Sequence, residues 1–345
     1  MKKIRAFISI LIALVTVMTV FTGCDLREQI ISLLADETEE ALDTAEETVP
    51  EETEKKNKTD KNDKTDKNDK EKPKETTGKN NDTEKDEDNG SNNNTALYEG
   101  ILYEREGDYI YFGEYPQSEK ADDVLVSSTS DYRGYYLGND GAYYAKVAPK
   151  YENTPKYYKV EPIRWRILEE GNGRAFLMCD SIIDAKEFDS SSNNYADSTL
   201  RAWLNSQFVD IAFESAQRKI IEDTKVDNSG KSTEWETNDY ACADTVDKIF
   251  LLSYVEATNA KYGFVTERMS EDSAKQLSPS DYAFIMGAWV DSSSPKKTGA
   301  WWLRSPHPIG SGNMTQAITS SGQANTIPYV YDDNTGVVPA IVIKL

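Results

Sequence analysis

Hydrophobic and polar positions divide the chain into three successive parts. An uncharged apolar run covers residues 6–21, and a polar stretch with almost no apolar residues extends from about Asp36 to Thr95. Beyond Leu97 apolar residues recur throughout, and all 20 tyrosines and all 6 tryptophans lie there. Because no second polar linker interrupts this part, the pattern predicts a single globular domain at residues 97–345, long enough to bury a core.

Within this domain, alternating or continuously apolar segments predict strands. In residues 161–168 ("EPIRWRIL"), Ile163, Trp165 and Ile167 alternate with polar residues, so one face of the strand would be apolar. Four further segments are aromatic-rich or apolar throughout, as in buried strands: 108–117, 174–180, 247–253 and 336–343.

Capping residues and helical spacing predict helices. Ser198 precedes a segment in which apolar residues form one stripe. The members of the stripe are Leu200, Trp203, Leu204, Phe208, Ile211 and Ala212. Ser278-Pro279-Ser280-Asp281 is typical of a capping box that opens a helix, and Ser253 to Glu256 repeats that signature after a strand. Together the elements predict an α+β fold rich in polar loops, without the alternation of parallel-sheet proteins.

The apolar run near the N-terminus has the layout of an export signal. Three basic residues (Lys2, Lys3 and Arg5) precede it, and it is shorter than the roughly 20 residues needed to span a bilayer. Residues 21–24 ("FTGC") resemble the lipobox of bacterial lipoproteins, although Phe21 stands where leucine is usual. This resemblance implies that residues 1–23 are a signal peptide and that Cys24 is acylated. An ordinary secreted protein and an uncleaved anchor are the alternatives.

The polar stretch that follows predicts a disordered tether. Residues 24–96 would comprise the acylated N-terminus and a linker of Glu, Asp, Lys, Thr and Asn, which cannot bury enough apolar area to offset its conformational entropy. The formal net charge of −21 argues against a nucleic acid partner, because such binding needs clustered Lys and Arg. We therefore expect a protein held on the extracytoplasmic side of the cell membrane, with the lipid bilayer as a partner through acylated Cys24.

Few residues of the domain suit catalysis or metal binding. His307 is the only histidine, and no motif of a nucleophilic hydrolase accompanies it. Zinc sites normally use several Cys or His ligands, whereas Cys179 and Cys242 are the only thiols beyond Cys24. These two thiols could pair, but we expect them to be free because Cys179 lies in a predicted core strand. The sequence predicts no metal site and no cofactor, and leaves any catalytic residue unknown.

Two loop segments contain the candidate ligand-binding residues. If the stretch "AWWLR" is a strand, Trp302 and Arg304 share a face, where a guanidinium stacked on an indole would either close the core or face a ligand. Tyr331 and Asp332 begin the segment "YDDNTG", which resembles the start of a calcium loop but lacks its glutamate. This segment predicts a turn.

Six blocks of sequence, in order, resemble the uncharacterised bacterial family called domain of unknown function 6273. They lie at residues 107–117, 161–168, 198–208, 247–257, 301–306 and 336–343. One departure is Val338, where the family has arginine. The family implies no activity, but the order of its last motifs looks like the end of C-type-lectin-like domains. That likeness implies a compact α+β fold with small antiparallel sheets, two helices and long loops.

These inferences predict a membrane-anchored lipoprotein that displays a non-catalytic binding domain. Its ligand would be a cell-wall polymer, a glycan or a surface protein. One alternative is an envelope glycan hydrolase, which would need two carboxyl groups at a set separation. A structural or assembly lipoprotein is the other alternative.

Overall fold

The long strand β7 (Lys156–Gly171) organises the computed structural model, which describes residues 94–98, 101–309 and 311–345. All of these belong to one unit, Lys85–Leu345. The predicted signal peptide, Cys24 and most of the predicted tether lie outside the described residues. In the part of the chain that is described, no helix is long and apolar enough to cross a membrane.

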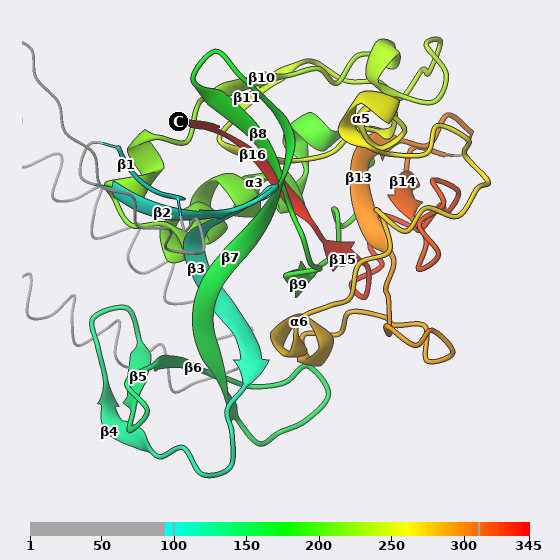
Figure 1. Cartoon of the computed structure of the whole chain (residues 1–345). Coiled ribbons are helices and arrows are strands. Elements are labelled where there is room, and N and C mark those ends of the chain that lie inside the picture. The colour runs from blue at the N-terminus through cyan, green and yellow to red at the C-terminus, as the bar shows by residue number, and fades with distance from the viewer. Residues whose placement is uncertain (1–93, 99–100, 310) are drawn as a thin grey trace, which may run out of the picture. The chain divides into compact units, whose positions relative to one another are not determined.

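Strands on both edges of β7 extend it into the main sheet (Figure 1). One edge pairs with β3, and the other pairs with β6 near the start of β7 and with β8 near its end. The other strands of this sheet are β1 (Asn94–Tyr98), β2 (Ile101–Glu106), β3 (Tyr109–Glu119), β4 (Val126–Ser130), β5 (Tyr135–Gly138), β6 (Tyr143–Val147), β8 (Arg174–Cys179), β12 (Ile249–Leu251) and β16 (Pro339–Lys344). The predicted domain boundary at Leu97 therefore falls inside β1.

Two smaller sheets complete the strands that the structure describes. Their members are β9 (Asp184–Ala185), β13 (Trp301–Pro306), β14 (Thr315–Ile318) and β15 (Gly336–Val337) in one sheet, and β10 (Thr224–Val226) and β11 (Thr245–Asp247) in the other. In the first of these sheets β13 pairs antiparallel with β14 and parallel with β15.

The helices are short. They are η1 (Tyr195–Asp197), α3 (Thr199–Trp203), the π-helical segment η2 (Leu204–Phe208), α4 (Val209–Ala212), η3 (Gln217–Lys219), η4 (Gly230–Ser232), α5 (Tyr254–Ala257), η5 (Ala260–Tyr262) and α6 (Asp281–Ile285). Sheet with few helices and long connections is an α+β arrangement, as the sequence predicts.

The predicted alternation in residues 161–168 is confirmed for most of its length. Ile163 and Trp165 are fully buried and Arg164 is exposed. Ile167 is only partly buried, because the register between β7 and β8 shifts beyond it and Leu168 points into the core instead. A bulge of this kind exchanges the two faces of a strand.

The apolar segment 336–343 is two strands, where the pattern predicts one. Its first residues form β15, and after Val338 the chain enters the main sheet as β16, between β8 and β12. Gly336 allows β15 to lie close to its neighbours, since a Cβ there would approach Ile182 to 2.5 Å. Val338, where the resembled family has arginine, is fully buried.

The helix predictions are correct in their caps and wrong in some details. The Ser198 side chain accepts from the Arg201 amide, and Ser253 and Glu256 form the expected capping box. The apolar stripe after Ser198 is largely buried, but Ile211 is exposed. The cap of α6 is Ser280 and not Ser278, whose hydroxyl donates to the Lys296 carbonyl instead.

Both cysteines of the described domain are free, as expected. Cys179 is buried in β8, and burial raises the pKa of its thiol to about 12. Cys242 lies in a loop and is only partly buried.

Candidate ligand-binding site

Strand β13 places Trp302 inside the core. Its side chain is 0 % exposed, its indole N–H donates to the Lys186 carbonyl at 2.8 Å, and its ring packs edge-on against Phe188. Trp301, on the other face of β13, is also fully buried and donates to the Lys275 carbonyl. Both faces of β13 are therefore core, which corrects the expectation that Trp302 contacts a ligand.

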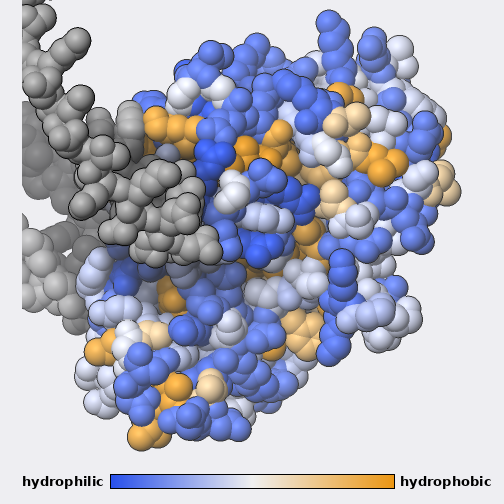
Figure 2. Space-filling model, viewed as in Figure 1, coloured by the Kyte–Doolittle hydropathy of each residue, from blue (hydrophilic) through white to orange (hydrophobic). Residues whose placement is uncertain are grey.

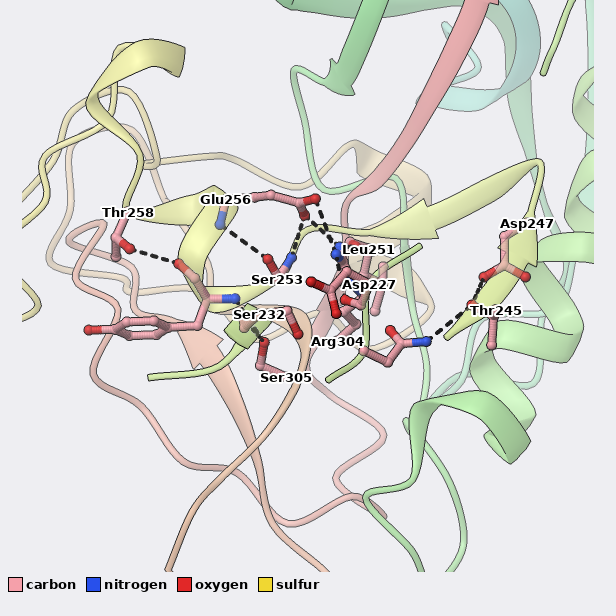
Figure 3. A network of polar contacts seen from close by, with 12 residues as sticks. Asp227, Ser232, Thr245, Asp247, Leu251, Ser253, Glu256, Thr258, Arg304 and Ser305 are labelled. Atoms are coloured by element: carbon pink, nitrogen blue, oxygen red, sulfur yellow. Dashed lines mark hydrogen bonds and ion pairs between the residues drawn. The ribbon is translucent and has the colours of Figure 1, made fainter. Parts of the chain in front are cut away.

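Arg304 is buried in a polar network (Figure 3). Its guanidinium donates to the Leu251 carbonyl at 2.7 Å and to the Asp227 carbonyl at 3.1 Å. It also forms an ion pair with Glu256, whose carboxylate accepts from the Ser253 amide in the capping box of α5. Arg304 thus joins β13 to α5 and to the loop at Asp227.

The role of Arg304 follows from these contacts. Its side chain is 2 % exposed, and the ring beneath its guanidinium is that of Phe250, at 5.9 Å. A buried arginine needs an anionic partner and acceptors for its N–H groups. Glu256 and the two carbonyls supply them for the two terminal nitrogens, whereas the buried Nε has no partner within the described residues. We therefore correct the ligand-binding expectation for Arg304, which is a strut between elements.

Tyr331 and Asp332 lie at the surface in a tight turn. The Asp332 amide donates to the Tyr329 carbonyl at 2.9 Å, and the Tyr329 amide donates to Asp332 Oδ2 at 3.0 Å. Between the two tyrosines, Val330 is fully buried, and its carbonyl accepts from the Phe188 amide. Val330 is thus anchored in the core, whereas the side chains of both neighbouring tyrosines are exposed.

The two tyrosine rings form a stacked, exposed pair. The ring centroids of Tyr329 and Tyr331 are 5.1 Å apart and the ring planes differ by 7°. The side chains are 41 % and 49 % exposed, respectively. Aromatic rings in an offset stack hold each other in place, so the pair presents a rigid surface.

A cavity of about 280 Å³ has Pro328 and Asp332 in its wall, next in sequence to these tyrosines, which do not line it themselves. Its lining residues are Trp289, Ala300, Thr326, Ile327, Pro328, Asp332, Asn334 and Thr335. Trp289 follows α6, is 50 % exposed, and is fixed at its amide by a hydrogen bond to the Asn334 carbonyl. We call this cavity, with Tyr329 and Tyr331 beside it, the aromatic pocket.

The chemistry of the aromatic pocket is that of a binding site. Asp332 is the only charged residue among those that line it. Within the described residues, Oδ2 of its carboxylate accepts a hydrogen bond from the Tyr329 amide and Oδ1 has no partner. Asn334 and two threonines add hydrogen-bonding groups beside the apolar surfaces. Small-molecule sites combine apolar walls with a few fixed polar groups. This cavity has both, with polar residues making up half of its lining.

A second, more polar groove lies along β7. It comprises two adjoining cavities of about 560 Å³ each, which share Gln117, Glu161, Asp180 and Ser181. Asp180 is held by ion pairs with Arg164 and Arg166, and Glu161 accepts from the Ser118 amide and hydroxyl. These carboxylates are already engaged by the protein itself.

Other exposed apolar side chains lie on the lobe formed by β4, β5 and β6. Figure 2 shows apolar residues gathered at the end of this lobe, at the lower left of the view. Leu125 and Leu137 are among the exposed side chains, and the guanidinium of Arg133 lies over three tyrosine rings (Tyr132, Tyr135 and Tyr143).

The remaining candidates from the sequence are a metal site and His307. Among the described residues, no group of three or more His, Cys, Asp or Glu side chains could hold a metal ion. His307 is partly buried, and its Nδ1 lies against the backbone of Ile309 in its own loop.

Sequence reasoning found two members of the aromatic pocket, Tyr331 and Asp332, and missed Trp289 and Tyr329. The signal for Tyr329 is the order Tyr-Val-Tyr, in which a buried valine lies between two exposed tyrosines. Trp289 could not be predicted, because it is far from the turn in the sequence and only the tertiary structure brings the two together.

A family model described as "Domain of unknown function (DUF6273)" matches residues 172–345, just over half of the chain. The match includes the later blocks of the resemblance but begins after the blocks at 107–117 and 161–168. The aromatic pocket lies within it, and the β4–β5–β6 lobe precedes it. No curated protein and no solved structure matches the chain.

Proposed function

Because the chain belongs to the DUF6273 family, which assigns no function to its domain, we propose a function from the geometry of the aromatic pocket. The protein is a lipoprotein on the extracytoplasmic side of the cell membrane, and its domain binds a glycan in this pocket. Of the ligands expected from the sequence, a glycan suits the pocket better than a protein surface, because the site is a small cavity beside flat rings.

The stacked, exposed pair of Tyr329 and Tyr331, together with the exposed Trp289 in the cavity wall, is the observation that carries this proposal. One face of a sugar ring is covered by C–H groups, and these pack on the face of an aromatic ring. The hydroxyl groups at the rim of the sugar need acceptors and donors, which Asp332 and Asn334 offer. A volume of about 280 Å³ is near the lower limit of ligand sites, and it suits one sugar unit of a longer chain.

The glycan hydrolase alternative has less support. A glycosidase needs a pair of carboxyl groups able to act as acid and as base or nucleophile. The groove along β7 is lined by four carboxylates. Asp180 is paired with two arginines, Glu161 is held by Ser118, Asp281 accepts from the Glu119 amide, and Glu104 is exposed. The aromatic pocket has Asp332 as its one lining carboxylate. A binding role therefore requires fewer further assumptions.

The C-type-lectin-like fold is part of the same proposal. Short helices and long loops are compatible with it, whereas the ten-stranded main sheet is larger than the small sheets expected. The aromatic pocket is built from such loops. A fold likeness gives no function by itself, so the glycan assignment depends on the pocket alone.

Replacing Trp289 with alanine should weaken glycan binding by about tenfold to a hundredfold, since an aromatic stacking surface contributes roughly 1–3 kcal/mol. The full chain, immobilised from detergent, is challenged with purified cell wall and glycan arrays. Affinity for the best-retained glycan is then measured for the wild type and the variant.

Trp235 offers a matched control, because it is also exposed, at 45 %, but does not line the aromatic pocket. Trp235→Ala should keep the wild-type affinity. Equal losses in both variants, or a wild-type chain that retains no wall fragment or glycan above background, would refute glycan binding in this pocket.

Replacing Cys24 with serine should abolish acylation. Cells that express the wild type should incorporate labelled palmitate into the protein and keep it in the membrane fraction, since each buried CH₂ adds about 0.8 kcal/mol to anchoring. The Cys24→Ser variant should lose both properties, whereas Cys242→Ser should keep them. Label in Cys24→Ser, or none in the wild type, would contradict the proposed anchor.

A further inference from the structure

The aromatic pocket has a negative charge at its wall and no positive one, and from this we infer that its glycan contains a protonated amine, as in amino sugars without an N-acetyl group. This inference rests on the proposed function, because it names the class of glycan that the same pocket would bind. The carboxylate of Asp332 has one oxygen without a partner within the described residues, aromatic side chains are exposed near it, and the ammonium of Lys150 is paired with Asp333.

The Asp332 carboxylate is available to a ligand. Its side chain is partly exposed at the wall of the cavity, and Oδ2 accepts from the Tyr329 amide. This bond fixes the orientation of the carboxylate, and Oδ1 has no partner among the residues that the structure describes. A fixed carboxylate with one open oxygen forms a charge-assisted hydrogen bond with an ammonium group.

The neighbouring carboxylate of Asp333, in contrast, already has a cationic partner. Its carboxylate lies 2.8 Å from the Lys150 ammonium, which also donates to the Asp333 carbonyl and lies over the Tyr151 ring. Lys150 is therefore engaged by Asp333, whereas Asp332 has no ion pair within the described residues. No lysine or arginine lines the cavity, so the charge of Asp332 is not balanced there.

The rings favour the same ligand. Trp289, Tyr329 and Tyr331 are all about half exposed, and an aromatic ring is electron-rich on its face. A cation over such a face gains about 0.5–1 kcal/mol at exposed sites and more when it is desolvated. A protonated sugar amine can therefore pair with Asp332 while its ring packs on the aromatic surface. A neutral N-acetyl group gains neither electrostatic term.

A matched pair of ligands tests this inference on the full chain in detergent. Glucosamine hexamer and N-acetylglucosamine hexamer share the same sugar backbone and differ in the protonated amine. The wild type should bind the glucosamine hexamer about tenfold more tightly, as one exposed ion pair with a cation–π contact allows. Binding is measured by calorimetry at mildly acidic pH, where the amines of the glucosamine hexamer are protonated, and at two salt concentrations.

Two substitutions separate the pocket from the general acidity of the chain. Asp332→Asn should remove the preference, so that the variant binds the two hexamers with equal affinity. Asp333→Asn changes the net charge equally but lies outside the cavity lining, so it should keep the preference. Since the formal net charge is −21, non-specific attraction of a cationic oligomer would be reduced equally by both.

Each result decides between the hypotheses. Equal affinity for the two hexamers, or equal losses in the two variants, would overturn the amine inference and leave glycan binding in place. Failure of both hexamers would also overturn it if the glycan array retains another sugar. If the array retains nothing, the proposed function fails as well. Displacement of the glucosamine hexamer by hexalysine at equal concentration would assign the pocket to a basic peptide and overturn both proposals.

Discussion

Replacing Trp302 with alanine is expected to lower the free energy of unfolding by about 3–5 kcal/mol, which is the usual cost of removing a fully buried aromatic side chain. Trp302 has no exposed surface, so the substitution leaves a cavity beside Phe188. It also leaves the Lys186 carbonyl without its 2.8 Å hydrogen bond. Most domains of this size are stable by only about 5–15 kcal/mol, so the variant should be close to unfolding.

Urea unfolding followed by circular dichroism measures this effect. Trp235→Ala is the matched control and should change the free energy of unfolding by no more than about 0.5 kcal/mol, as exposed positions usually do. Trp302→Phe should lie between the two, because it keeps a ring but not the indole N–H. An unchanged urea midpoint for Trp302→Ala, combined with lost glycan binding, would instead restore a direct ligand role for Trp302.

Replacing Lys275 with methionine is also expected to cost about 3–5 kcal/mol, because breaking a buried ion pair leaves one charge without compensation. Lys275 is fully buried, and its ammonium donates to the Ala257 carbonyl at 2.9 Å and lies 3.4 Å from Asp272 Oδ2. Burial lowers the pKa of Lys275, which is the expected direction for an ammonium removed from water. Methionine has a similar shape and no charge, so the loss would be electrostatic.

The reason for a large effect is the position of Asp272. It is 4 % exposed, and its two oxygens accept from the amides of Val265 and Ala274. Without Lys275, this carboxylate would stay buried with no cation beside it. The ammonium thus links residues 257–275 into one folded segment, whose Lys275 carbonyl accepts the indole N–H of Trp301.

A double variant makes this prediction specific. Lys275→Met combined with Asp272→Asn removes both charges, and it should recover part of the stability lost in Lys275→Met alone. The free energies of unfolding of the two single variants and the double variant are compared in urea. If Lys275→Met unfolds at the wild-type midpoint, the buried pair does not stabilise this segment. If the double variant loses the sum of the two single effects, the two charges are not coupled.

The candidate site was only partly accessible from the sequence. Tyr331 and Asp332 could be selected because they lie in one turn, where neighbouring residues decide the geometry. Trp302 and Arg304 could not be assigned between core and surface, because alternation along a strand says which side chains share a face and not what covers that face. The structure covers both faces of β13, so the candidate residues Trp302 and Arg304 belong to the core.

By itself, the sequence determined the features that depend on near neighbours: the strands β3, β7, β8 and β12, the caps at Ser198 and Ser253, and the change from a polar stretch to a folded domain. A cap or an alternating strand is specified within a few residues, and local spacing records it. Only the tertiary structure decided that one apolar run is shared between β15 and β16, that Ser280 caps α6, and that Trp289 meets Asp332. Those outcomes depend on which surfaces pack together between segments far apart in the chain. Such packing produces no regular spacing of residues from which it could be predicted.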